Sequence, residues 1–195
     1  SSAEAWALAG SIALVTAAAM EPWARLLHRE AWHARLWWIH RTHHEPQPGR
    51  FEKNDWLSFL HAPFAVALIV GGCQLHGFLR AGLVGVGSGM TLFGLAYVLV
   101  HDGLVHGRLG VGGLLRWRFF RRVRGAHLVH HEGGGAPYGL FLGPQELMAR
   151  KIKLRQNHMR RAADPQITGH PRQVERPLRR RDALLGTIGQ PQQAR

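Results

Sequence analysis

Histidines gather in four short segments of this chain. Ten of the 14 histidines lie in these segments, at His28/His33, His40/His43/His44, His101/His106 and His127/His130/His131. A neutral imidazole nitrogen is the commonest metal ligand in proteins, and one ion takes about four to six ligands. We therefore expect the fold to bring the four segments together, and ten rings predict a centre for two metal ions.

The spacing within the segments predicts their local structure. Both triplets follow the pattern H-x-x-H-H, which places three rings on one face of an α-helix, so each triplet is expected to bind metal as a unit. In the two pairs the rings are five residues apart, which turns the second about 140° away from the first. The helix should loosen or end between them. Gly103 would permit this in the second pair, and for the first pair we expect a helix end nearby.

The other histidines and the single cysteine carry little information. Isolated histidines are usually ordinary side chains, and we interpret four in this way: His61, His76, His158 and His170. Cys73 lies in an apolar run and fits neither a disulfide nor a thiol active site.

Three apolar runs predict membrane spans. They are Ala5–Leu27, Trp56–Leu75 and Ala81–Val100, each near the 20 or so residues that cross a bilayer. A cleaved signal peptide is not expected for the first run, because no Lys or Arg precedes Arg25. A soluble bundle is the alternative, favoured only by the mean hydropathy of −0.14. We predict an all-α integral membrane bundle of three to four spans, with cytoplasmic helical extensions that carry the histidine-ligated di-metal site.

The third run is rich in glycine, and aromatic residues flank the runs. Glycines at 82, 85, 87, 89 and 94 would allow close helix packing or leave a groove. Trp32, Trp37, Trp38 and Trp56 suit the membrane interface, where indole rings collect.

Positive charge predicts the orientation. Of the 25 Lys and Arg residues, none precedes Arg25, six lie from Arg25 to Lys53, one is Arg80 in the second loop, and 18 follow the third run. Cytoplasmic loops are the positively charged ones. We therefore expect all four histidine segments on the cytoplasmic side of a bacterial inner membrane.

The C-terminal part is strongly basic. We predict a membrane-embedded hydroxylase domain over residues 1–149 and a basic, disordered cytoplasmic tail over residues 150–195, with a short helix at its start. Anionic lipid is the expected partner of this tail, at about 1 kcal/mol per basic side chain near the surface. Nucleic acid is not expected as a partner.

The histidine segments resemble a known family. The carotenoid 3-hydroxylases of bacteria, or β-carotene hydroxylases, have similar blocks to LHREAWH, WIHRTHHEPQPGRFEKNDW, YVLVHDGLVHGR and GAHLVHHEGGGAPYGLFLGP. They are part of the membrane fatty-acid hydroxylase and sterol desaturase superfamily, and the likeness covers Met20 to Pro144. Two departures are visible: HGRLG replaces an arginine followed by a proline, and the tail is longer and more basic.

The resemblance implies an O2-dependent carotenoid 3-hydroxylase, which is a monooxygenase. Two iron ions of a non-haem centre, held by the ten histidines, would activate O2 and hydroxylate carbon 3 of the β-ionone ring. β-Carotene would become β-cryptoxanthin and then zeaxanthin. The carotenoid would come from the bilayer and the electrons from a ferredoxin-type or other donor.

Carboxylates close to the histidines in sequence are candidates to orient them. A metal-bound histidine commonly donates its other N–H to a carboxylate. The nearest are Asp102, Glu45, Glu132 and Asp55, of which Asp102 is the preferred candidate. A solvated loop acid is the alternative reading of Asp102.

Other functions remain open at this point. Within the superfamily, the alternatives are a carotenoid ketolase and a fatty-acid or sterol hydroxylase or desaturase. A membrane metal transporter or sensor would also use histidines, but would more naturally place ionisable residues along the spans, where this chain has little besides His61 and His76. A structural membrane protein with incidental histidines is disfavoured by the two triplets.

Overall fold

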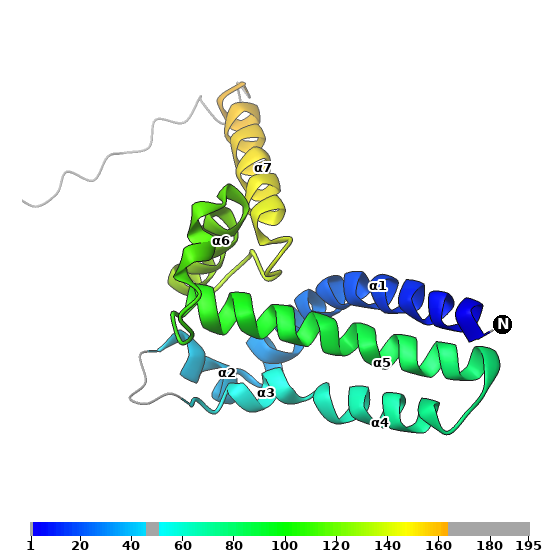
Figure 1. Cartoon of the computed structure of the whole chain (residues 1–195). Coiled ribbons are helices and arrows are strands. Elements are labelled where there is room, and N and C mark those ends of the chain that lie inside the picture. Colours follow the sequence, from blue (N-terminus) through cyan, green and yellow to red (C-terminus); the bar gives the residue numbers. More distant parts are fainter. Residues whose placement is uncertain (1, 46–50, 164–195) are drawn as a thin grey trace, which may run out of the picture. The chain divides into compact units, whose positions relative to one another are not determined.

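The computed structural model describes residues 2–45 and 51–163, and these are helical with no strand (Figure 1). The predicted disorder of the tail beyond residue 163 lies outside the described residues. The elements are α1 (Ser2–Leu27), η1 (His28–Arg35), α2 (Trp37–His44), α3 (Asp55–Phe59), α4 (Ala62–Cys73), α5 (Gly77–Val98), η2 (Leu99–Val105), η3 (Gly112–Arg116), α6 (Arg118–Gly133) and α7 (Gly143–Ala163). The chain divides into two compact units, the first ending at Lys153 and the second beginning at Leu154.

Three helical segments are long and apolar enough to cross a membrane, as predicted. They are Ala3–Arg35, Asp55–Cys73 and Gly77–Val105. Many of their outward side chains are apolar, with Val15 70% and Phe78 80% exposed. Exposed apolar faces of this length are stable in lipid, where a helix satisfies its own backbone hydrogen bonds. The all-α membrane fold is therefore confirmed, while the orientation in the membrane stays a prediction.

The second span is divided near its start. Helix α3 ends at Phe59 and α4 begins at Ala62, with Pro63 in its first turn. Proline has no backbone N–H to donate and is tolerated in the first turn of a helix, where that donor would be unused. The short helix α3 can therefore take a direction of its own beside the histidine segments.

Glycines allow α5 to pack closely between α1 and α4, which run beside it (Figure 1). A Cβ atom at Gly85 would lie 2.8 Å from the carbonyl oxygen of Ala9 in α1, and one at Gly87 would lie 2.7 Å from that of Ala65 in α4. A Cβ at Gly89 would meet the carbonyl oxygen of Ala13. Packing is thus the use of these three glycines. Gly82 has open space around it.

Replacing Gly89 by Ala should destabilise the bundle. The added methyl group would push against the backbone of α1, and overpacking of this kind costs about 1–3 kcal/mol. The matched control is Gly82→Ala in the same helix. Thermal unfolding in detergent should show a lower midpoint for G89A alone, and equal midpoints for the two variants would contradict the packing.

The helix loosens within both histidine pairs. The segments η1 and η2 are π-helical, with backbone hydrogen bonds between residues five apart, as from Leu36 N to Ala31 O at 2.8 Å and from His106 N to His101 O at 3.0 Å. In such a helix residues five apart share a face. The first pair also lies near a helix end, as expected, because η1 ends at Arg35 and Leu36 is a turn.

Gly103 lies within the loosened helix, as expected, and it also has a packing role. It is buried within η2, and a Cβ there would lie 2.9 Å from Cγ2 of Val111. Its missing side chain therefore makes room for the segment that follows η2. It does not break the helix.

The helix α7 crosses the boundary predicted at residues 149 and 150. It runs for 21 residues, where only a short helix was expected at the start of the tail. The division into a hydroxylase domain and a tail stays a prediction.

Candidate metal centre

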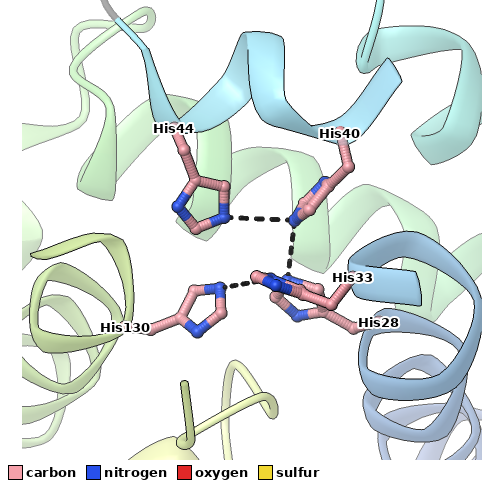
Figure 2. Close-up of side chains that lie close together, drawn as sticks. All are labelled: His28, His33, His40, His44 and His130. Atoms are coloured by element: carbon pink, nitrogen blue, oxygen red, sulfur yellow. Dashed lines mark hydrogen bonds between the residues drawn. The ribbon is translucent and has the colours of Figure 1, made fainter. Parts of the chain in front are cut away.

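The histidine segments converge into two adjoining groups of ring nitrogens. In each group, one nitrogen from every ring lies within 4.8 Å of all the others. The group of five contains His28, His33, His40, His44 and His130 (Figure 2), and the group of four contains His43, His101, His106 and His127. The group of five comes from η1, α2 and α6, and the group of four comes from α2, η2, the residue after η2, and α6. Each group could hold one metal ion.

The triplets are divided between the groups, which corrects the expectation that each binds metal as a unit. In α2, His40 and His44 join the group of five, whereas His43 joins the group of four. Side chains four residues apart share a helix face, and the ring between them points to the neighbouring group. Helix α6 is divided as well, because His130 joins the group of five and His127 the group of four. Both helices therefore connect the two groups.

His131 lies beside both groups without belonging to either. Its Nε2 atom is 3.0 Å from Nε2 of His127, and its ring stacks on that of His44 with centroids 4.4 Å apart. The structure thus brings all ten predicted rings together. That each of them is a ligand stays a prediction.

Burial keeps the rings neutral. Burial, together with the neighbouring imidazoles, lowers the pKa of His40 to about 3, that of His106 to about 3 and that of His130 to about 4. The pKa of His43 and that of His127 are well below the usual value for the same reasons. At neutral pH these rings hold no extra proton, so each has a lone pair available to a metal ion.

In the group of five, neutral oxygen atoms fix the rings from behind. The Nδ1 atom of His28 donates to the carbonyl oxygen of Tyr138 at 2.8 Å, and that of His130 donates to the carbonyl oxygen of Gly135 at 2.7 Å. The Nδ1 atom of His40 donates to Oδ1 of Asn54 at 2.7 Å. Each proton is therefore on Nδ1, and each lone pair is on Nε2, facing inward.

In the group of four, the acceptors that face the Nδ1 atoms are carboxylates. The Nδ1 atom of His43 lies 3.2 Å from Oε2 of Glu52, and that of His101 lies 3.2 Å from Oδ1 of Asp102. Asp102 thus lies where sequence reasoning placed it, although its role is still a prediction. Glu45 and Glu132 are exposed.

Asp55 contacts an arginine and no histidine among the described residues. Its Oδ1 atom lies 2.9 Å from Nη1 of Arg108, and its Oδ2 atom accepts from the backbone N–H of Glu52. Sequence reasoning did not identify Glu52, Asn54 or the two carbonyl groups. FEKND was noted only as part of a family block, and carbonyl oxygens leave no signal in a sequence.

The inward nitrogens are arranged for a cation. The Nε2 atoms of His28 and His40 are 3.0 Å apart, although both rings carry their proton on Nδ1 (Figure 2). Two facing lone pairs repel each other unless a positive charge lies between them. In the group of four, Nε2 of His43 and Nε2 of His106 are buried without a hydrogen-bond partner. Such uncompensated acceptors are costly in a protein without a metal ion, so the residues fit the metal that the sequence predicts.

Two glutamates hold the loop that supplies the carbonyl acceptors. Glu21 in α1 is buried and accepts the backbone N–H of Leu142 at 2.9 Å. Glu146 accepts the backbone N–H groups of Tyr138 and Gly139, each at 3.1 Å, and pairs with Arg25. Sequence reasoning did not identify Glu21. It is a buried carboxylate that fixes the loop behind His28 and His130.

An apolar cavity borders both groups. Trp32 lies in its wall and contacts the rings of His28 and His40, while Tyr97 in the same wall stacks on His101 with centroids 4.8 Å apart. The cavity has a volume of about 50 Å³. Its wall consists of Met20, Ala24, Leu27, Trp32, Leu57, Ser58, His61, Met90, Phe93, Gly94, Tyr97 and Val98. Two residues of the cavity wall thus contact rings of both histidine groups.

Removing one ring from either group should reduce the bound metal. We expect His43→Ala and His130→Ala each to lower the metal content from about two ions per chain to about one, because a site that loses a ligand from a set of four or five binds weakly. The measurement is elemental analysis of purified protein. His158→Ala, at an exposed position in α7, is the control. Unchanged metal content in H43A and H130A would exclude these rings as ligands.

Comparison with known proteins gives one family and several relatives. The family model described as fatty acid hydroxylase matches residues 13–147. A β-carotene hydroxylase of Pantoea ananas is 35% identical, over 80% of this chain and 89% of the relative. A chloroplastic β-carotene 3-hydroxylase of Gentiana lutea is 48% identical, over 71% of this chain and 44% of its own length, and β-carotene hydroxylase 1 of Capsicum annuum is 47% identical, over 70% and 44%. This chain therefore spans less than half the length of the plant relatives. No solved structure matches.

Proposed function

Because this chain belongs to the fatty acid hydroxylase family, we propose that it is a membrane oxygenase that hydroxylates carbon 3 of the β-ionone ring of carotenoids. The proposed products of β-carotene are β-cryptoxanthin and then zeaxanthin. The observation that carries the proposal is the pair of buried histidine groups beside an apolar cavity at the ends of membrane spans. The relatives named β-carotene hydroxylases support the choice of substrate.

The proposed cofactor is a pair of non-haem iron ions, with O2 as co-substrate. The ten histidines would hold the ions, and the ions would supply the oxidation of an unactivated C–H bond, which side chains alone cannot perform. One oxygen atom enters the substrate and the other leaves as water, which consumes two electrons and two protons. The electrons would come from a ferredoxin-type or other external donor.

The cavity suits a hydrocarbon that arrives from the bilayer. The ring of a carotenoid would enter it beside Trp32 and Tyr97 while the polyene chain stays in the lipid. The present volume is smaller than such a ring, but Met20 and Met90 line the cavity. Unbranched thioether side chains adapt readily to a new occupant, so these two residues can make room.

The membrane side and the lipid partner are also proposals. The excess of Lys and Arg around the histidine segments supports a cytoplasmic site at a bacterial inner membrane. Anionic lipid is the proposed partner of the basic residues beyond Arg150.

Expression in cells that accumulate β-carotene tests the activity. The chain should convert β-carotene into β-cryptoxanthin and zeaxanthin, measured by chromatography of extracted pigments. His43→Ala and His130→Ala should yield neither product while the protein remains in the membrane fraction. Unchanged β-carotene in the presence of iron-loaded protein would contradict the proposal and favour a fatty-acid or sterol substrate.

A variant at Gly94 tests the cavity separately. Gly94 lines the cavity, and a Cβ there meets no atom within 4 Å, so Gly94→Leu should fill the cavity without disturbing the backbone. We expect at least a tenfold loss of product at unchanged metal content. Gly82→Leu in the same helix, also in open space but away from the cavity, is the control. Equal product from G94L and G82L would exclude this cavity as the substrate site.

A further inference from the structure

The two histidine groups differ in the charge of the atoms behind their rings. In the group of five, the three Nδ1 atoms with a partner donate to two backbone carbonyls and to the Asn54 amide, all of which are neutral. In the group of four, the two Nδ1 atoms with a partner face the carboxylates of Glu52 and Asp102. The difference arises from the surroundings, because all ten candidate ligands are imidazoles.

One arginine forms ion pairs with both carboxylates. Nη2 of Arg108 lies 2.5 Å from Oε1 of Glu52, and Nη1 lies 3.4 Å from Oδ1 of Asp102 and 2.9 Å from Oδ1 of Asp55. The contact with Glu52 is an ion pair whose angle does not satisfy a hydrogen bond. A guanidinium is permanently charged in proteins, so Arg108 holds both carboxylates toward their histidines.

A carboxylate acceptor makes an imidazole a stronger donor to a metal ion. The negative charge draws the Nδ1 proton and increases electron density on Nε2, and removing such a partner usually lowers metal affinity 10- to 100-fold. A neutral carbonyl or amide has a weaker effect. The charge of the hydrogen-bond partners therefore predicts different metal affinities for two sites whose ligands are all imidazoles.

We propose that the metal centre is asymmetric, with the tighter site in the group of four, and that Arg108 is the positioning residue that maintains this difference. The inference rests on the metal binding proposed above. The metal affinity of the tighter site depends on Glu52 and Asp102. The affinity of the weaker site is lower because the partner of His40 is the neutral amide of Asn54.

Two reciprocal substitutions test the asymmetry. Glu52→Gln replaces a carboxylate behind His43 with an amide of the same shape, whereas Asn54→Asp replaces the amide behind His40 with a carboxylate. Full-length protein is stripped of metal with a chelator and titrated with Co²⁺, and binding is followed by absorbance and calorimetry. Glu45→Gln, at an exposed carboxylate next to His44, is the matched control for E52Q. Circular dichroism checks that each variant keeps its helices.

The wild-type chain should bind two Co²⁺ ions in two resolved steps. E52Q should weaken the tighter step by about 10- to 100-fold and leave the other unchanged. N54D should strengthen the weaker step by a similar factor, which misfolding could not imitate. Arg108→Gln should weaken the same step as E52Q, and E45Q should match the wild type.

The possible failures are distinguishable. Binding of no Co²⁺ by the wild-type chain would contradict the metal centre itself. Two equal steps in the wild type, or a loss in E52Q confined to the weaker step, would overturn the asymmetry while leaving the centre intact. No gain in N54D would equally overturn the ranking by partner charge.

Discussion

The structure depends on burying neutral imidazoles with their lone pairs turned toward one another. Water cannot solvate these nitrogens, and no proton lies between facing Nε2 atoms such as those of His28 and His40. The arrangement is held from outside, because the oxygen acceptors behind His28 and His40 keep the proton of each ring on Nδ1. Without a cation it contains unpaired buried acceptors, and with a cation it becomes a set of ready-made ligands.

The membrane helices supply the positions that this centre needs. Close packing at Gly85, Gly87 and Gly89 brings α5 against α1 and α4, and η1 and η2 form the ends of two of these spans. The π-helical turns then align rings that an α-helix would turn apart. The same ends of the spans border the apolar cavity. A lipid-soluble substrate and a metal centre can thus meet at one place.

The sequence predicted the spans and the convergence of the histidines because hydrophobic length and clustered ligands are local patterns. It also predicted that the helix changes between histidines five residues apart. It did not predict the division of each triplet, because a shared helix face does not determine which neighbour each ring meets. Glu52 and Asn54 were not identified because their contacts with His43 and His40 form only in three dimensions. The loop carbonyls of Gly135 and Tyr138 belong to the backbone, which every residue has.

The central claim is that the ten rings converge, through inward-facing nitrogens, on two metal ions. X-ray absorption spectroscopy of the zinc-loaded, full-length protein tests it most directly. The account predicts two zinc ions per chain, nitrogen neighbours at about 2.0–2.1 Å and the outer-shell scattering typical of imidazole. A first shell dominated by oxygen, or zinc far below two ions per chain, would contradict it.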